Sequence, residues 1–291
     1  MMIDYFLSKK NINEIQKVII SLNTLKKRIT NQDYSNAFKE YKESQSLFKY
    51  IKQYAIQNKD EELANAQYIF KCYFLFFANL SSFFLLLQEK KYTKSWIKLQ
   101  DCIDNSVFFL RFEAKQNYDL NNLSKILYEY EKLYPYTYFF SSEFIYKRAE
   151  CSICGKSILD LNCPHIVGEL YWGDCAVQII SEIEKFQAIA LVENPKDKRC
   201  ILSISNDRRT EEEKFIALEN IFLNFKNHLQ TFNIKKTYIK KRDTRVPEIG
   251  KNQICFCGSS KKFKKCCMKK MYYNHCHFEI TVSKAIQINY F

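Results

Sequence analysis

The chain has 291 residues, of which 47% are hydrophobic and 26% charged, and it contains 24 Phe and 20 Tyr. This composition is typical of a folded protein with room for two or three domains. Glycine and proline are scarce, at 5 and 4 residues, which excludes collagen-like, Gly/Ser-linker and Pro-rich disordered classes. The net charge is +13, and residues 235–270, with thirteen Lys and Arg against two acids, carry +11 of it. The basic character is therefore one local stripe.

The first residues lack the basic segment followed by an apolar one that marks a secretory signal. We therefore expect a cytoplasmic protein whose twelve cysteines are thiols or metal ligands and not disulfides. The most apolar segment, 72–87, contains three polar residues and lies between charged ones. Because a membrane span needs about 20 apolar residues, this segment predicts a buried helix, and no membrane span is expected.

Residues 11–148 contain no glycine and only one proline. Their aromatic side chains are expected to form the core of a helical domain over 1–148. Apolar residues at helical spacing predict helices, with Asp33 and Thr93 as candidate N-caps, over 11–30, 34–57, 60–89, 92–115 and 120–133.

The region 149–233 has a mixed pattern. Segments 183–192 and 200–205 flank a turn at 194–198 and predict a β-hairpin. Thr210 and Glu213 form a capping box at the start of a predicted helix over 210–230, with His228 partly exposed. One apolar stripe of this helix is formed by Phe215, Leu218, Phe222, Phe225 and Leu229.

The last part of the chain is predicted to hold a basic linker over 234–248, a second cysteine module over 249–270 and a tail over 271–291 that includes a possible short strand. Together with the helical domain and the mixed central region, this organisation predicts an α+β protein.

The first cysteine cluster consists of Cys151, Cys154, Cys163 and His165. A C-x2-C pair directs two sulfurs to one point, and the glycine after it permits the tight turn. With the C-x-H pair it completes four S and N ligands, the set that Zn²⁺ binds tetrahedrally in structural sites. Cys175 is an alternative ligand in place of the histidine. This cluster is similar to C-x-x-C-G-K…C-x-H segments of uncharacterised bacterial and phage-related proteins, to which no activity is attached.

The second cluster consists of Cys255, Cys257, Cys266 and Cys267, with the spacing C-x-C-x8-C-C. Four thiolates on Zn²⁺ leave a charge of −2, which the four lysines between the two pairs would offset. Adjacent cysteines can converge on one ion only where a helix or turn begins. Alternative ligands nearby are His275, Cys276 and His277.

The second cluster resembles the SEC-C motif, the small metal-binding tail of the bacterial preprotein translocase ATPase, which also occurs in many otherwise unrelated bacterial proteins. Besides the four cysteines, the matching residues are Asn252, Gly258, Ser259, Lys261, Lys262, Phe263 and Lys264. In place of the usual Arg, Asp, Pro, Pro and Gly, the sequence has Lys251, Gln253, Ile254, Phe256 and Ser260. The last ligand, often His in the family, is Cys here. The resemblance implies a metal site, with zinc or iron, that docks on partners such as an export chaperone or the ribosome.

The sequence contains none of the phosphate-binding, dinucleotide-binding, zinc-protease or nucleophile-elbow motifs, so we expect no enzyme. The predicted function is a non-catalytic adaptor with two structural zinc sites that docks a protein partner through its basic SEC-C tail. Binding of RNA or DNA by the stripe 235–270 is the alternative, and an enzyme whose site is assembled from distant residues is the third. The candidate partner- or phosphate-binding residues are Lys261, Lys262, Lys264 and Lys265.

Overall fold

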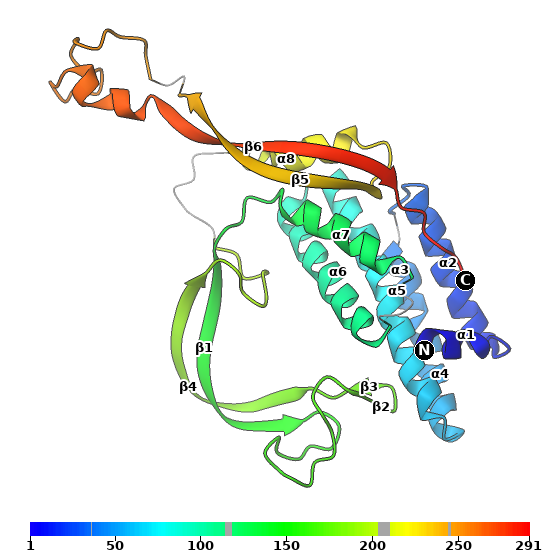
Figure 1. Cartoon of the computed structure of the whole chain (residues 1–291). Helices are drawn as coiled ribbons and strands as arrows, with labels where there is room; N and C mark the ends of the chain where they lie inside the picture. Colours follow the sequence, from blue (N-terminus) through cyan, green and yellow to red (C-terminus); the bar gives the residue numbers. More distant parts are fainter. Residues whose placement is uncertain (36, 114–117, 203–209, 244–245) are drawn as a thin grey trace. The chain divides into compact units, whose positions relative to one another are not determined.

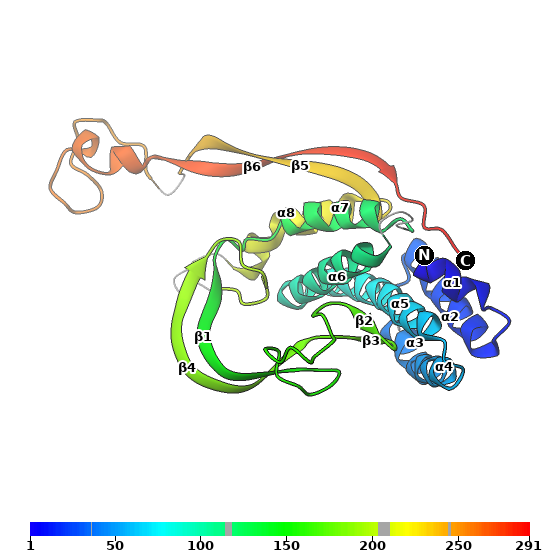
Figure 2. The ribbon, with the colours of Figure 1, turned by 60° about the horizontal axis from the view of Figure 1, so that its bottom comes forward.

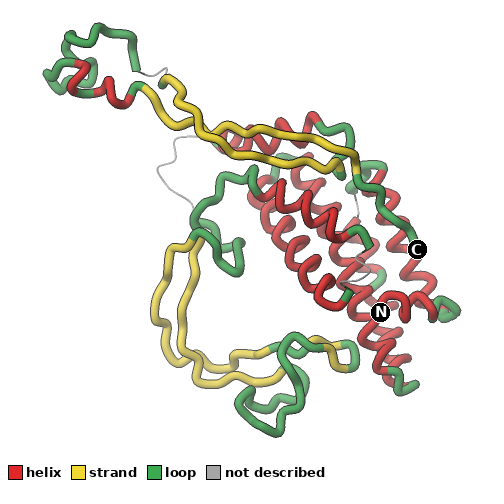
Figure 3. Tube along the Cα trace, viewed as in Figure 1, coloured by secondary structure: helices red, strands yellow, loops and turns green. Residues whose placement is uncertain are grey.

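The computed structural model covers the whole chain and describes all residues except 36, 114–117, 203–209 and 244–245. It contains helices and long strands (Figure 3), which confirms the α+β class. Seven described helices precede the first strand, and α8 lies among the strands. The chain forms two compact units. One comprises residues 1–231 together with 284–291, and the other comprises residues 232–283.

The first unit is built around one long central helix. Helix α5 contacts α1, α2, α3, α4 and α6, while α7 packs against α6 (Figure 1). The described helices that precede the first strand are, in chain order, α1 (Met2–Ser8), α2 (Asn13–Thr30), α3 (Ala37–Glu43), α4 (Gln45–Gln57), α5 (Glu61–Gln88), α6 (Tyr92–Phe112) and α7 (Leu120–Glu131).

Helix α5 is apolar on nearly all sides because other helices surround it. Asp60 caps its start by accepting a hydrogen bond from the Leu63 N–H at 2.9 Å. By length and hydropathy alone the helix could cross a membrane, but 67% of its most apolar window is buried inside the protein. The predicted buried helix is thus confirmed as the core of this unit. Its aromatic side chains with less than 2% exposure are Phe70, Tyr73, Phe74, Phe76, Phe77, Phe83 and Phe84.

The helix predictions were wrong in three places. The segment 34–57 is not one helix, because α3 ends before Ser44 and α4 begins after it. Thr93 does not cap α6, since it lies inside that helix. Asp33 accepts a hydrogen bond from the Ser35 N–H and pairs with Arg28 instead of capping a helix start. The first helix, α1, was not predicted at all, and the last part of the predicted helix 92–115 lies outside the described residues.

Because this region lacks glycine, residues with side chains adopt the left-handed conformation at the ends of three of these helices. The residues that follow α2, α4 and α5 include Gln32, Lys59 and Lys90, with φ values of 59°, 55° and 55°. Each precedes a residue whose N–H bonds back to a carbonyl five residues earlier, at 2.8 to 2.9 Å, which is the helix-ending pattern that usually contains glycine. Three side-chain-bearing residues therefore adopt a left-handed conformation that costs each about 1 kcal/mol or more.

A long two-stranded ribbon follows the helices. Strand β1 (Phe139–Cys151) pairs antiparallel with β4 (Gln178–Val192), from Phe139 opposite Val192 to Cys151 opposite Gln178. The predicted hairpin between 183–192 and 200–205 was therefore wrong. Residues 200–202 bond instead to the start of β1, where the Phe140 N–H donates to the Cys200 carbonyl at 2.8 Å. Residues 203–205 lie outside the described residues.

Both ends of this ribbon are attached to the helices (Figure 2). At the open end, the Phe139 ring stacks on Trp96 of α6 with centroids 6.2 Å apart. The other end carries a small hairpin of β2 (Leu170–Tyr171) and β3 (Asp174–Cys175). In its turn, Gly173 donates its N–H to Asn65 of α5 at 2.8 Å. A Cβ on Gly173 would lie 2.8 Å from the Ala64 carbonyl oxygen, so only glycine permits this close approach.

Helix α8 (Glu211–Asn224) begins with the predicted capping box of Thr210 and Glu213. It ends at Asn224, six residues before the predicted end. His228 consequently lies after the helix, and it is only 7% exposed and not partly exposed as predicted. Its ring stacks on Phe222 with centroids 3.9 Å apart, and its Nδ1 lies 2.7 Å from the Tyr34 hydroxyl. Burial among these rings lowers the His228 pKa to about 4.

The second unit begins within another two-stranded ribbon. Strand β5 (Gln230–Arg242) pairs with β6 (Tyr272–Ala285). Most of the predicted basic linker 234–248 is thus strand, and the predicted tail 271–291 contains a long strand instead of a short one. At one end of the ribbon the Asp243 N–H donates to the Met271 carbonyl, and at the other the Ile286 N–H donates to the Leu229 carbonyl. The two strands therefore run antiparallel.

Residues 286–291 return to the helical unit and cover a buried lysine. Lys26 of α2 is fully buried, and its Nζ donates to the Asn289 carbonyl at 2.8 Å. The ammonium group also lies 4.1 Å from the centroid of the Phe291 ring and 4.8 Å from that of Tyr73. Burial lowers the Lys26 pKa to about 7, against the opposing effect of Asp119.

The Lys26 pKa predicts how stability depends on pH. Between pH 7 and the ordinary lysine pKa of 10.5, the unfolded chain holds a proton on Lys26 that the folded chain has released, so the free energy of unfolding rises with pH. Lys26 should raise the free energy of unfolding by a few kcal/mol between these two pH values, at about 1.4 kcal/mol per pH unit. Denaturant unfolding at pH 7 and pH 9.5 measures the rise, which Lys26→Met should reduce. An equal rise in the variant and the wild type would contradict the assignment.

Candidate metal centres

The first cluster lies in the connection between β1 and β4. Cys151 is the last residue of β1, and its N–H donates to the Lys156 carbonyl at 2.8 Å. Gly155 donates its N–H back to the Cys151 carbonyl at 2.9 Å and has a φ of +69°. This conformation favours glycine, so Gly155 closes the C-x2-C turn and directs both sulfurs to the same side.

The four predicted ligands of this cluster come together. Their ligand atoms all lie within 4.8 Å of one another. The sulfurs of Cys154 and Cys163 are 3.6 Å apart, and the Cys163 sulfur is 3.9 Å from the His165 Nδ1. Ligands about 2.3 Å from one tetrahedral ion are about 3.8 Å apart, whereas disulfide sulfurs are about 2.05 Å apart. The separations therefore fit a shared metal ion and not a disulfide.

The groups around these ligands also favour metal binding. The backbone N–H of Cys154 donates to the Cys151 sulfur and lowers the pKa of that thiol, which favours the thiolate that a metal requires. The Tyr171 ring meets the His165 ring edge-on with centroids 4.6 Å apart, which restricts the orientation of the imidazole. Cys175 lies in β3 and is not part of this group of four.

The second cluster lies in the connection between β5 and β6. The Cys255 N–H donates to the Lys261 carbonyl at 2.8 Å, and Gly258, with φ +75°, donates its N–H to the Cys255 carbonyl at 3.3 Å. Cys266 and Cys267 lie where two short 3-10 helices meet, η1 (Phe263–Lys265) and η2 (Cys267–Lys270). The structure thus places the adjacent cysteines at a helix start, as predicted.

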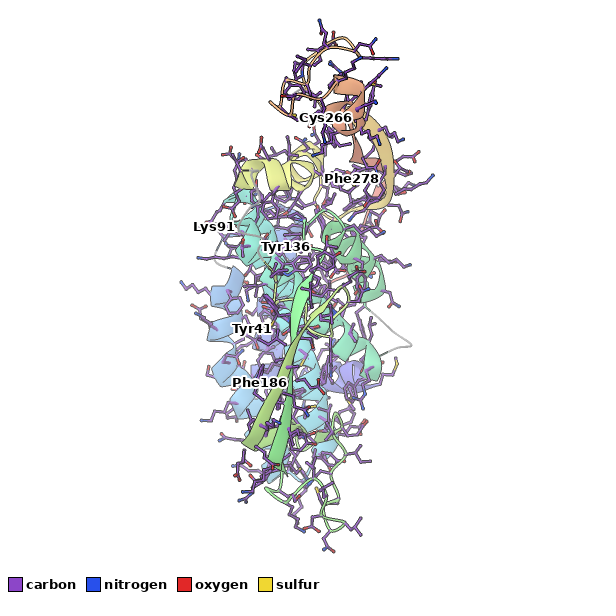
Figure 4. The ribbon with its side chains drawn as sticks, turned by 90° about the vertical axis from the view of Figure 1, so that its left-hand side faces the viewer. Tyr41, Lys91, Tyr136, Phe186, Cys266 and Phe278 are labelled. Atoms are coloured by element: carbon purple, nitrogen blue, oxygen red, sulfur yellow. The ribbon has the colours of Figure 1, made fainter. Side chains whose placement is uncertain are left out.

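The four sulfurs of the second cluster also lie within 4.8 Å of one another. Cys257 is 3.5 Å from both Cys255 and Cys266, and the sulfurs of Cys266 and Cys267 are 3.8 Å apart (Cys266 is labelled in Figure 4). These separations match the edges of a tetrahedron around one ion. Cys276 and His277, the predicted alternatives, lie in β6 and are not part of this group; the His275 side chain is outside the described residues.

The thiols of this cluster differ in acidity. Hydrogen bonds from Ser259 lower the pKa of Cys257 to about 6, while hydrogen bonding with Cys255 and Cys257 raises the pKa of Cys267 to about 12. Four thiolates this close repel one another, so all four can ionise only around a cation. The sequence prediction assigned no role to Ser259, whose hydroxyl is 3.3 Å from the Cys266 sulfur, although it matches the motif.

The second centre has little apolar core and a basic exterior. Its buried core consists of Val246, Cys255 and Phe263. The side chains of Lys261, Lys262, Lys264 and Lys265 are all exposed. One of these three core residues, Cys255, is itself a candidate ligand, so an ion bound by the four cysteines would supply cohesion that the apolar contacts do not.

Comparison with known proteins identifies only the second centre. Residues 252–269 match the family model of the SEC-C motif, so the resemblance seen in the sequence is confirmed for this segment. No curated protein and no solved structure matches the chain. The chain therefore carries a SEC-C motif and a second four-ligand cluster on a fold for which no relative is found.

Ser260 predicts a stability change in the SEC-C motif. It has a φ of +54° and occupies the position where the motif usually has glycine. Ser260→Gly should remove a left-handed strain of about 1 kcal/mol, so transfer of metal to a competing chelator should slow about fivefold. Ser259→Gly is the matched control, and it should speed the transfer because it removes the hydroxyl beside Cys266. If Ser260→Gly released metal as fast as the wild type, the strain argument would be wrong.

Proposed function

We propose that this protein is a non-catalytic adaptor with two structural zinc sites. Both donor sets, three thiolates with one imidazole and four thiolates, are those of structural zinc. In each set all four tetrahedral positions are filled by the protein, which leaves no position for a reacting water. The four-thiolate site also suits iron, so metal analysis has to distinguish the two there.

The zinc proposal predicts the metal content. Protein purified under reducing conditions should contain about two zinc equivalents, because each cluster binds one ion. Cys151→Ser should lose one equivalent and Cys255→Ser the other, while Cys102→Ser, in the helical core, should keep both. Mass spectrometry of the metals measures this. Two retained equivalents in either cluster variant would refute the ligand assignment, and iron released only from the second cluster would restrict zinc to the first.

The second part of the proposal is that the SEC-C motif docks an acidic protein partner in the cytoplasm. The observation that carries it is the group of four exposed lysines between the two cysteine pairs, whose backbone is held in place by the ligands. A basic surface fixed on a small rigid module suits recognition of clustered carboxylates. Docking of a chaperone or the ribosome, which the family resemblance implies, fits this chemistry. RNA phosphate is the competing ligand.

Docking is best tested with point variants, since a truncation after residue 248 would remove β6 and the segment 286–291 that covers Lys26. Replacement of all four lysines (261, 262, 264 and 265) by Gln, which removes their charge without adding carboxylates beside the thiolates, should abolish capture of a specific protein from a lysate of the source cells. The matched control replaces four exposed lysines of the helical unit, 17, 49, 94 and 125, by Gln, and should keep that capture.

Three readouts make this test decisive. Both variants should retain two metal equivalents, which shows that loss of capture is not loss of the fold. Capture that persists after nuclease treatment supports a protein partner, whereas capture that nuclease abolishes supports the nucleic-acid alternative. Equal capture by the two variants would exclude the lysines as the docking surface.

A further inference from the structure

The ribbon of β1 and β4 has one strongly apolar face. Paired residues of antiparallel strands point to the same face, and the face alternates along the strand. Even-numbered residues from Phe140 to Tyr146 therefore share a face with their partners on β4. The register shifts in this stretch insert extra residues in β4 only, so the alternation along β1 is uninterrupted. The large apolar side chains on this face are Phe140, Phe144, Tyr146, Ile183, Phe186, Ile189 and Leu191.

The opposite face is different. There Ser141 lies opposite Ala190, Glu143 opposite Ala188, and Ile145 opposite Lys185. These residues are small or charged except for Ile145. The ribbon is therefore amphipathic, as is typical of a sheet with one face covered and one face in water.

The apolar face is not covered by the described part of this chain. Its seven large side chains are 37% to 62% exposed; one of them, Phe186, is labelled on the ribbon in Figure 4. The contacts with the helices are made at the ribbon ends, at Phe139 and through the hairpin of β2 and β3. A two-stranded ribbon without a packed face is at best marginally stable, and an apolar patch of this kind marks an interaction site.

We propose that a second copy of this chain covers this face, with the two ribbons packed face to face around a two-fold axis. In such a dimer each apolar face meets an identical one, so the chain supplies both halves of the interface. Seven side chains that each expose roughly 100 Å² would bury roughly 700 Å² per copy, or about 1,400 Å² in total, which is the size of a stable specific interface.

Charge also favours a second copy. Within the two strands the charged residues are nearly balanced, with four acids (Glu143, Glu150, Glu182, Glu184) against three basic residues (Lys147, Arg148, Lys185). Although the chain as a whole carries +13, two ribbons can approach without strong repulsion between their own charges. The basic residues are concentrated in 235–270, outside this ribbon.

The oligomeric state of the full-length, metal-loaded protein tests the proposal. Sedimentation equilibrium should show a dimer of the wild type, and Phe186→Asp should weaken it at least about 30-fold, as expected for a buried aromatic at an interface centre. The matched control is Ile145→Asp, which places the same charge at a similarly exposed residue on the opposite face, and it should remain dimeric. Ile183→Asp is a second variant on the apolar face and should also dissociate the dimer.

Metal content and far-UV circular dichroism should be the same in all three variants, because each changed side chain is exposed. In the wild type, amide exchange of β1 and β4 should slow as the protein concentration rises through the dimer dissociation constant. A monomeric wild type at 100 µM would overturn the proposal, as would a dimer that survives both Phe186→Asp and Ile183→Asp. Loss of a different co-purifying protein in these variants, with a monomeric wild type, would assign the face to that protein instead.

Discussion

The convergence of cysteine and histidine ligand atoms, which lie within 4.8 Å of one another in each cluster, is the constraint on which the second half of this structure depends. Each of the two ribbons is closed by a connection far longer than a hairpin turn, residues 152–177 in one and 243–271 in the other. A loop of such length does not by itself bring two strands into register, because closing it costs entropy and it forms few local contacts. In both connections four ligand side chains converge within 4.8 Å of one another. The four-ligand cluster therefore takes the place of the turn.

This arrangement explains why the ligands lie where they do. Cys151 is both the last residue of β1 and the first candidate ligand, so an ion bound there would directly fix one strand of the first ribbon. In the second ribbon the final ligand, Cys267, begins a 3-10 helix that ends two residues before β6. Neither connection contains a large apolar core, in contrast to the helical unit, where aromatic side chains around α5 provide the cohesion. The molecule thus combines two sources of stability, and removal of the metal should affect only one of them.

Much of this organisation could be predicted from the sequence, because the decisive patterns are local. The spacing of the cysteines indicates both clusters, and the apolar run of 72–87 indicates the central helix. The strand partners could not be predicted, because the paired strands are separated along the chain by the long connections that hold the two clusters. β4 pairs with a strand about forty residues away and not with the segment across its nearest turn. β5 is rich in lysine, and buried and exposed residues alternate only over 232–235, which is too short a pattern to predict the whole strand. His228 is buried by Tyr34, which is 194 residues distant.

The glycine distribution connects these observations. In the helical unit, left-handed residues that end helices carry side chains, as at Lys59 and Lys90, and the large aromatic core tolerates that cost. The two connections that hold the clusters have no comparable apolar core among their described residues to offset such a cost. There, glycine occurs where the backbone must turn next to a ligand, at Gly155 and Gly258. Among the described residues of the two connections, Trp172 in the first and Ser260 in the second are left-handed residues that carry side chains; Ser260 lies within the small second centre. A module with few apolar contacts can keep this strain only if another interaction compensates for it, and the metal–sulfur bonds of the proposed site would be that interaction.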